Sequence, residues 1–312
     1  MSSMTLTELK YIVAVADQRH FGRAAESCFV SQPTLSVAIK KLEDELGLIL
    51  FERLKKEIRI TPAGKPVIEQ ARKILNQTLE LKKLAQSMND PLGLPLNFGA
   101  IYTIAPYILP YLIPEVHQSA PNMPLVIEEN MTAVLAQKLQ QGELDAILVA
   151  QPFDEQGIKT VPLYSEPFRV VLPSSHPLLE NDYISAEELS DQNLLLLGAG
   201  HCFRDQVLEF CGPCLQQTGS THSLQRTVEG TSLETIRHMV ATGMGITVLP
   251  CSAAGTDRYS QRLLAIRRFA EPEPHRTIVL AWRNEFSRPE AITALHKALQ
   301  ACISQISCLT PL

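Results

Sequence analysis

Apolar residues recur at helical spacing throughout the first ninety residues, and this spacing predicts a compact group of helices. The first helix has its apolar face on Leu6, Leu9, Ile12, Val13 and Ala16. A second, short helix is predicted over 21–28. A third begins at the N-cap Ser31, with Pro33 in its first turn, and Gly47 ends it.

Two short helices joined by a tight turn match a helix-turn-helix, whose second helix enters the major groove of DNA. The outward positions of that second helix are polar: Gln32, Thr34, Ser36, Lys40 and Lys41. The segment 51–61 is predicted to form a hairpin with four basic residues, a wing that would neutralise backbone phosphates. The alternative is a small helical bundle with a solvated basic face.

A long helix is predicted to begin within 61–64 and to run for about 27 residues, or some 40 Å. Its apolar seam alternates steps of four and three residues: Val67, Ala71, Ile74, Thr78, Leu81, Ala85 and Met88. A single helix of this length cannot bury such a stripe by itself. We therefore expect two chains to pair along it.

After the turn residues of 89–95, strands alternate with helices, which predicts an α/β fold with parallel sheet. The predicted strands are 96–101, 125–128, 145–149, 169–172, 194–197, 245–249 and 278–282. The predicted helices are 132–141, 232–242 and 289–306, with a bent helix around Pro110 and Pro114. This part divides most naturally into two lobes with a cleft. Thr103 and Thr132 fall at helix starts, as caps or as ligand contacts.

The chain has 312 residues, 45% of them hydrophobic and 20% charged, so it is an ordinary globular protein of about two domains. Taken alone, its net charge of −5 argues against nucleic-acid binding. The two parts of the chain differ, however, because residues 1–90 carry +3 and residues 91–312 carry −8. Neither an export signal nor an apolar stretch near the roughly 20 residues of a membrane span is visible. We therefore expect a cytoplasmic protein without membrane contact.

The seven cysteines are an odd number in a chain with no visible export signal, so we expect reduced thiols. Any disulfide among them would then be regulatory rather than structural. Cys202 lies beside His201 and Arg204, two potential cations that would favour a nucleophilic thiolate. Four others are expected to be small buried hydrophobes: Cys28, Cys251, Cys302 and Cys308.

Cys202 and Cys211 are predicted to lie on one helix, because Phe203, Val207 and Phe210 fall at helical spacing. Their separation of nine residues places them on opposite faces and about 13.5 Å apart along the axis. A disulfide needs Cα atoms within about 7 Å, so the two thiols could bond only if this helix unfolds. Oxidation would then convert one local fold into another.

The run Cys-Gly-Pro-Cys at 211–214 is identical to the thioredoxin active-site motif and opens a second interpretation, a disulfide oxidoreductase. Thioredoxins place this motif at a helix start after a strand, whereas here it follows an amphipathic helix. Cys214 is also an alternative partner for Cys202. A third interpretation is a structural zinc site on Cys202, Cys211, Cys214 and His222, although its spacing is irregular.

Several motifs in the first ninety residues resemble the DNA-binding head of LysR-type transcriptional regulators. They are Phe-Gly-Arg-Ala-Ala at 21–25, Val-Ser-Gln-Pro-Thr-Leu-Ser at 30–36, Leu-Phe-Glu-Arg at 50–53 and Thr-Pro-Ala-Gly at 61–64. The resemblance implies a winged helix-turn-helix domain over 1–64, all-α with a small β wing. It assigns the DNA contacts to Gln32, Thr34, Ser36, Lys40 and the wing residue Arg53.

The same resemblance implies a linker or dimerisation helix over 65–91 and a regulatory domain over 92–312. That domain would be a two-lobed α/β structure like a periplasmic binding protein. Lobe one would comprise 92–165 and 269–312, and lobe two 166–268, with the chain crossing near Glu166 and returning near Phe269.

The run Gly-His-Cys-Phe-Arg-Asp-Gln at 200–206, with a second cysteine nine residues after the first, resembles the peroxide-sensing members of this family. The resemblance makes Cys202 the peroxidatic thiol, which is oxidised to a sulfenic acid, and Cys211 the resolving thiol, which forms the disulfide. It places four further residues near the reactive thiol: Thr103, Thr132, His201 and Arg276.

A regulator of this kind is not an enzyme and needs no cofactor or metal. Its implied partners are double-stranded promoter or operator DNA, hydrogen peroxide, RNA polymerase, and a thiol reductant such as glutaredoxin or thioredoxin. Its implied assembly is a dimer of dimers. It would act as activator or repressor in the oxidative-stress response, through a redox-active disulfide that changes oligomer geometry. The alternative is a LysR-type regulator that senses a small metabolite in the interlobe cleft, with incidental cysteines.

Overall fold

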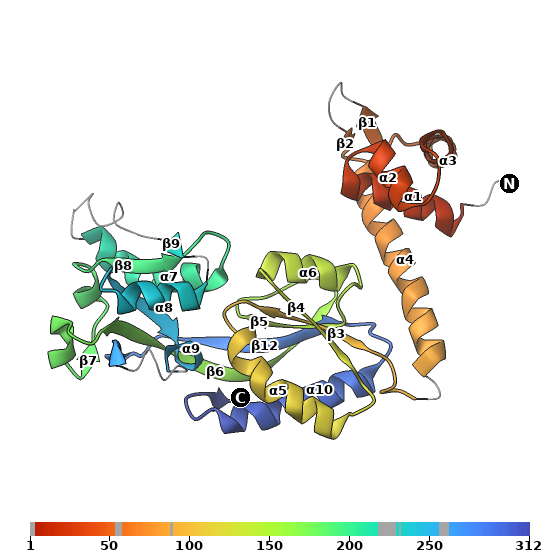
Figure 1. The fold of residues 1–312 in the computed structure, drawn as a ribbon. Helices are drawn as coiled ribbons and strands as arrows, with labels where there is room; N and C mark the ends of the chain where they lie inside the picture. The colour runs from red at the N-terminus through yellow and green to blue at the C-terminus, as the bar shows by residue number, and fades with distance from the viewer. Residues whose placement is uncertain (1–3, 54–57, 88–89, 218–228, 231, 256–261) are drawn as a thin grey trace. The chain divides into compact units, whose positions relative to one another are not determined.

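The computed structural model of the chain describes residues 4–53, 58–87, 90–217, 229–230, 232–255 and 262–312. The chain forms two compact units, 1–86 and 87–312 (Figure 1). The first is helical with a small hairpin and the second is α/β, as the change of hydrophobic pattern at 89–95 predicts. In the ranges described, no helix combines the length and the apolar character needed to cross a membrane.

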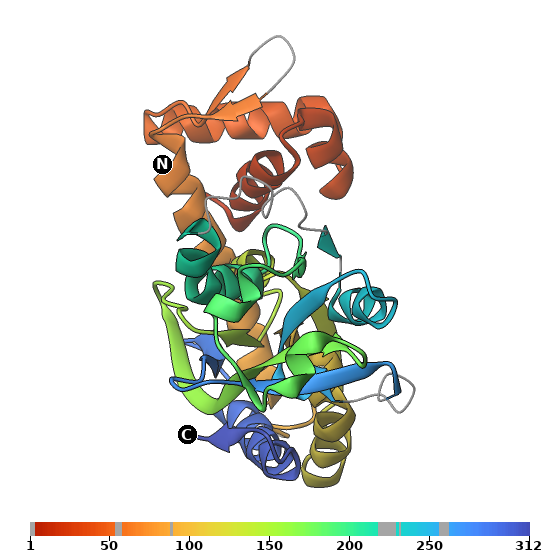
Figure 2. The ribbon, with the colours of Figure 1, turned by 90° about the vertical axis from the view of Figure 1, so that its left-hand side faces the viewer.

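The first unit packs its helices around one apolar core. Its elements are α1 (Leu6–Gln18), α2 (Phe21–Ser27), α3 (Gln32–Leu46), β1 (Phe51–Arg53), β2 (Ile58–Ile60) and α4 (Gly64–Ser87). Thr5 and Glu8 form a capping box on α1, and the Ser31 hydroxyl accepts the Thr34 N–H at the start of α3. Gly47 ends α3 at a φ of 65°. The antiparallel strands β1 and β2 form the predicted hairpin (Figure 2).

The long helix α4 is described over 24 residues, from Gly64, within the predicted start, to Ser87, and Met88 of the predicted seam lies outside the described residues. The Thr61 hydroxyl accepts the Gly64 N–H at 2.8 Å and so caps the helix there. Ile68 and Ala71 are buried in the core of the first unit. Three leucines farther along the helix are exposed to 50%, 67% and 47%: Leu79, Leu81 and Leu84. The far half of this helix therefore keeps apolar surface in contact with water in the single chain.

The second unit contains two apolar cores, which define two lobes. Lobe one contains β3 (Leu96–Ile101), α5 (Ala105–Ser119), β4 (Leu125–Asn130), α6 (Thr132–Gln140), β5 (Ala146–Ala150), β12 (His275–Arg283), α10 (Pro289–Gln305) and β13 (Thr310–Pro311). Figure 1 shows α6 on one face of its sheet, with α5 and α10 on the other. Pro110 and Pro114 both lie inside α5.

Lobe two packs around the second core. It contains η1 (Pro177–Glu180), β7 (Tyr183–Ile184), η2 (Glu187–Leu189), β8 (Leu194–Leu197), α7 (Cys202–Gln217), β9 (Glu229–Gly230), α8 (Leu233–Ala241), β10 (Ile246–Pro250), α9 (Cys251–Ala254) and β11 (Leu264–Phe269). β6 (Ile158–Pro173) belongs to both lobes, because it pairs with β12 along one part and with β10 and β11 along another.

The sheet is mixed, which corrects the prediction of a parallel one. β3 lies parallel to β4 and β5, and β8 parallel to β10, as the alternating pattern predicts. β12, however, is antiparallel to both β5 and β6, and β10 is antiparallel to β6. The predicted strand 169–172 is only the end of β6, whose 16 residues cross from one lobe to the other.

Cys251 and Cys308, which the sequence suggests are separate buried thiols, form a disulfide. Their Cα atoms are 6.2 Å apart although 57 residues separate them in the chain. They meet because α9 begins beside the segment that joins α10 to β13. A hydrophobic pattern reports local structure and carries no information about such a long-range contact. Cys28 and Cys302 carry free thiols, as expected.

Candidate functional site

The thiol of Cys202 lies where two helices begin. Cys202 is the first residue of α7, and Thr132 is the first residue of α6. The Thr132 hydroxyl donates a hydrogen bond to the sulfur, with an Oγ1–Sγ distance of 3.6 Å. Helix starts and hydroxyl donors both stabilise negative charge. The half-buried thiol is therefore in surroundings that suit a reactive, negatively charged sulfur.

The turn into α7 requires a glycine. Gly200 has a φ of 95°, a conformation that other residues rarely adopt, and a Cβ atom there would lie 3.0 Å from the sulfur of Met131. Because Met131 immediately precedes Thr132, the missing side chain lets the start of α7 approach the start of α6. This close approach brings Cys202 to Thr132.

A buried ion pair joins β6 to β12 near the same helix. Neither Glu166 nor Arg276 exposes any of its side chain, and the Arg276 Nε donates to Glu166 at 2.8 Å. The guanidinium also donates to the hydroxyl and to the carbonyl oxygen of Thr103, both at 2.9 Å. Its carbon lies 5.2 Å from the ring centre of Phe203, the residue after Cys202. A fixed positive charge is thus held beside the start of α7.

The structure places the four predicted pocket residues in three positions. Thr132 contacts the thiol, whereas Thr103 and Arg276 bind each other. His201 precedes Cys202 in the chain, and its ring centre lies 6.0 Å from that of Tyr102. What these residues do toward peroxide remains a prediction.

The positive charge expected from His201 next to Cys202 is corrected by the structure. Burial lowers the pKa of His201 below its ordinary value of 6.5, so its ring is neutral at pH 7. The Arg204 side chain donates to the carbonyl oxygen of Leu197 at 2.8 Å. The buried cation at this site is Arg276, which comes from a strand more than seventy residues away.

Cys211 is fully buried in the core of lobe two, in the same apolar cluster as Phe203 and Val207. The helix α7 is continuous from Cys202 through Cys211, as predicted. At about 1.5 Å per residue, the two cysteines are about 13.5 Å apart along its axis. Neither cysteine is in a disulfide, so the chain shows the helical, reduced arrangement of this segment.

The Cys-Gly-Pro-Cys run lies in the second half of α7 and not at a helix start, unlike its position in thioredoxins. The side chain of Cys214 and the whole of His222 lie outside the described residues. Within the part of the chain that the structure describes, no three His, Cys, Asp or Glu residues are grouped so as to hold a metal ion.

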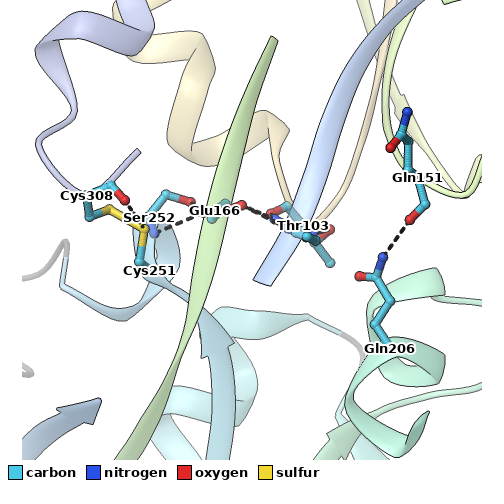
Figure 3. Close-up of polar contacts among 8 residues, drawn as sticks. Thr103, Gln151, Glu166, Gln206, Cys251, Ser252 and Cys308 are labelled. Atoms are coloured by element: carbon cyan, nitrogen blue, oxygen red, sulfur yellow. Dashed lines mark hydrogen bonds and ion pairs between the residues drawn. A yellow bond between two sulfur atoms is a disulfide. The ribbon is translucent and has the colours of Figure 1, made fainter. Parts of the chain in front are cut away.

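Two polar contacts connect the lobes. Gln206 on α7 donates to the carbonyl oxygen of Gln151, just after β5, at 2.9 Å (Figure 3). Tyr107 on α5 donates to the carboxylate of Glu234 on α8 at 3.0 Å. A movement of α7 would therefore break a direct hydrogen bond to lobe one.

Sequence reasoning missed Glu166 and Gln206 as parts of this site. Glu166 lies in the largely apolar segment 161–172, and a carboxylate in such a strand is a signal of a buried partner. Gln206 belongs to the run 200–206, but its partner Gln151 is too distant in the chain to be read from that motif.

A cavity of about 600 Å³ opens beside this site. Its lining comes from both lobes and includes Tyr102, Pro106, Glu129, Met131, His201 and Ser232. The cleft predicted between the lobes is therefore present, and it reaches His201.

In the first unit, α3 presents the side chains predicted to meet DNA. Gln32, Thr34 and Lys40 are exposed and Ser36 is half-buried. Lys41 lies 3.6 Å from the carboxylate of Glu8 and so has a protein partner. Arg53 lies in β1, but its side chain and residues 54–57 of the predicted wing lie outside the described residues.

Two family profiles match the chain: the bacterial regulatory helix-turn-helix protein of the lysR family over residues 6–65, and the LysR substrate binding domain over residues 90–302. The chain belongs to the LysR family of bacterial regulators. It is 40% identical to the hydrogen peroxide-inducible genes activator of Dickeya chrysanthemi over 280 residues, 90% of each chain. It is 39% identical to the transcriptional dual regulator OxyR of Escherichia coli K12, again over 90% of each.

Solved structures give the same result. A full-length OxyR variant from Pseudomonas aeruginosa is 51% identical, with a TM-score of 0.77 over 99% of both chains. A hydrogen-peroxide-bound OxyR variant from Corynebacterium glutamicum is 33% identical, with a TM-score of 0.62 over 97% of this chain and 94% of that one. The winged head and two-lobed α/β domain expected from the sequence are therefore confirmed.

Replacing Glu166 with Gln should lower the free energy of unfolding by about 3–5 kcal/mol, because it leaves the buried Arg276 charge without its counter-ion. Urea unfolding of the full chain measures this. The control is Glu128→Gln, which breaks a half-exposed ion pair with Lys138 and should cost at most about 1 kcal/mol. Equal losses for the two variants would show that the buried pair carries no special stability.

His201 should make the protein less stable as pH falls below about 6.5. Its pKa is lowered in the folded state, so the unfolded chain takes up the proton first and acidification favours unfolding. Melting temperatures between pH 7.5 and 5.5 should therefore fall more steeply for the wild type than for His201→Gln. Parallel curves for the two proteins would contradict the effect of burial on this ring.

Proposed function

We propose that the chain is a hydrogen-peroxide-sensing transcription regulator in which Cys202 is the sensing thiol. The observation that carries this proposal is the surroundings of that thiol. Its sulfur lies at a helix start and accepts a hydrogen bond from the Thr132 hydroxyl at 3.6 Å. The buried Arg276 guanidinium lies over the ring of the next residue, Phe203. Peroxide-inducible activators among the relatives support the same chemistry.

The first step is an attack of the Cys202 thiolate on one peroxide oxygen. The oxygen–oxygen bond breaks, the sulfur becomes a sulfenic acid, and the second oxygen leaves as hydroxide, which takes a proton to become water. The Thr132 hydroxyl donates to the reacting sulfur, and the Arg276 guanidinium, held by Glu166 and Thr103, adds positive charge from its place over the ring of Phe203. The neutral His201 ring can form a hydrogen bond with peroxide without adding a second positive charge to that of Arg276.

The second step joins the two cysteines of α7. The Cys211 thiol attacks the sulfenic sulfur, a disulfide forms and water leaves. Because the helix holds these cysteines about 13.5 Å apart, it must unwind before they meet. Unwinding takes Cys211 out of the lobe-two core and removes Gln206 from Gln151, so oxidation changes how the lobes meet. A dithiol reductant such as glutaredoxin or thioredoxin reverses the step.

The output of this switch is a change in binding to promoter DNA. The exposed polar side chains of α3 are placed on one helix that can enter a major groove. The exposed leucines of α4 supply an apolar surface for pairing two heads, and two such dimers would form the tetramer. Contact with RNA polymerase and action in the cytoplasm complete the proposal.

Hydrogen peroxide in equimolar amount should lower the intact mass of the full chain by about 2 Da, the loss of two thiol hydrogens. Cys202→Ser should abolish this loss. Cys211→Ser should stop the reaction at the sulfenic acid, whereas Cys214→Ser should leave it unchanged.

Cys302→Ala is the matched control for this experiment. Burial and the Glu115 charge raise the pKa of the Cys302 thiol to about 12, so it should take no part. An unchanged mass of the wild-type protein would sink the peroxide proposal. Loss of the disulfide in Cys214→Ser rather than in Cys211→Ser would reassign the resolving thiol.

Lys40→Ala should weaken binding to all DNA sequences and reduce the slope of log affinity against log salt by about 1, as expected for one lost phosphate contact. Gln32→Ala should instead reduce discrimination between operator and unrelated DNA, with little change in salt slope. Titrations at several salt concentrations measure both quantities. Unchanged affinity, discrimination and salt slope in both variants would remove α3 from the DNA interface.

A small-metabolite sensor is a second candidate function, favoured by the cavity of about 600 Å³ between the lobes. In that case the cysteines would be incidental. The mass experiment distinguishes the peroxide sensor from the metabolite sensor, because a metabolite sensor would not form a disulfide at Cys202 and its mass would not fall.

A further inference from the structure

The disulfide between Cys251 and Cys308 lies far from the cysteines of α7 in the chain, at the point where the lobes meet. Cys251 is the first residue of α9 and follows β10 directly. Cys308 follows α10 and precedes β13. The bond therefore attaches a helix that follows a lobe-two strand to the C-terminal segment of lobe one.

Packing on both sides supports this description. Cys251 belongs to the apolar core of lobe one, whereas Ala253 and Ala254 of the same short helix belong to the core of lobe two. The C-terminal segment is held on β6, where Thr310 pairs with Ser165. The disulfide consequently links the two lobes beside the strand that crosses between them.

Ser252 connects this disulfide to the buried ion pair. Both its backbone N–H and its hydroxyl donate to one carboxylate oxygen of Glu166, the first at 3.1 Å (Figure 3). The other oxygen of that carboxylate holds Arg276, which in turn holds Thr103. A continuous series of hydrogen bonds thus runs from the residue next to Cys251 to the guanidinium.

The series ends at the sensing segment. The Arg276 guanidinium lies over the ring of Phe203, which is covalently next to Cys202. Each link is a buried or half-buried group joined to the next by hydrogen bonds, the kind of contiguous network through which two sites are coupled.

We propose that Cys251 and Cys308 form a second thiol–disulfide couple, which exchanges electrons with glutathione-type thiols and adjusts the reactivity of Cys202 through Ser252 and Glu166. The closed disulfide holds α9, and with it the Glu166–Arg276 pair, in the arrangement described above. Opening it releases α9 from the C-terminal segment. The part of this inference that concerns Cys202 rests on the proposed function.

The exchange is balanced without any other reactant. A glutathione thiolate attacks the sulfur of Cys308, which is more exposed than that of Cys251, the sulfur–sulfur bond breaks, and Cys251 leaves as a thiolate and takes a proton. A second glutathione thiolate attacks the glutathione sulfur of the mixed disulfide, which releases oxidised glutathione and the Cys308 thiol. Two electrons pass to the pair, and oxidised glutathione reverses the sequence.

The first experiment tests the couple itself. The full chain is equilibrated with reduced or oxidised glutathione, quenched in acid, alkylated after unfolding and digested with trypsin. A cross-link between peptides 238–258 and 298–312 should rise from below about a tenth of the chains in reduced glutathione to above about half in oxidised glutathione, reversibly.

Because peptide 298–312 carries both Cys302 and Cys308, two variants identify the partner. Cys302→Ala should keep the cross-link and Cys308→Ser should lose it. The absence of any cross-link in oxidised glutathione would overturn the couple, whatever the fate of the peroxide proposal. A cross-link that reduced glutathione cannot open would also overturn it, because the bond would then be purely structural.

The second experiment tests the coupling to Cys202. In a background of Cys211→Ser and Cys214→Ser, a dimedone-type probe traps the sulfenic acid and reports its rate of formation. Adding Cys251→Ser and Cys308→Ser should slow that rate by about two- to thirty-fold, the range that 0.5–2 kcal/mol of coupling gives.

Ser252→Ala is the second variant, because it interrupts the network while keeping the disulfide, and it should slow the reaction in the same sense. Cys28→Ser, which removes a half-buried thiol of the first unit, should leave the rate unchanged. Equal rates with and without the cross-link would overturn the coupling. No sulfenic acid in the background protein would defeat the proposed function and the coupling together, while the cross-link experiment would still decide the couple.

Discussion

The buried ion pair between Glu166 and Arg276 is the constraint on which the second unit depends. Two charges without solvent contact are tolerated only when each has its counter-ion and further hydrogen bonds. Here Arg276 also binds Thr103, and Glu166 also accepts from Ser252. These partners come from four separate segments, so the chain cannot satisfy the charges unless both lobes are assembled. The arrangement of the lobes is consequently fixed by the need to keep these two buried charges paired and hydrogen-bonded.

The strand β6 explains how one ion pair can influence two lobes. It is continuous over 16 residues and contributes to the sheets of both, with Glu166 about midway. The start of α7 lies against the guanidinium on one side, and α9 lies against the carboxylate on the other. A redox reaction at either helix therefore alters the surroundings of the same pair of charges. The backbone of β6 carries one of these charges and runs through both lobes.

The sequence predicts this molecule well where the determining forces are local. The cap at Ser31, the stop at Gly47 and the periodicity of α7 are short-range features, and each is found in the structure. The pairing of Cys251 with Cys308 and the burial that keeps His201 neutral depend on residues brought together by the fold. The family resemblance names Thr132 and Arg276 beside Cys202, and the structure brings Thr132 to the thiol and the Arg276 guanidinium to the ring of Phe203. The counter-ion Glu166 and the lowered pKa of His201 could not be predicted in this way, because both depend on burial that the fold creates.

The burial of Cys211 has a consequence for timing. A thiol in the closed core of lobe two is out of reach of a sulfenic acid on Cys202 until α7 opens. Local opening of a packed helix is a rare excursion whose frequency depends on the contacts that must be broken. On the proposed mechanism, the lifetime of the sulfenic acid is therefore set by packing rather than by sulfur chemistry. Mutations in the apolar face of α7 would change the frequency of this opening, and with it the time for which the sulfenic acid persists after a brief exposure to oxidant.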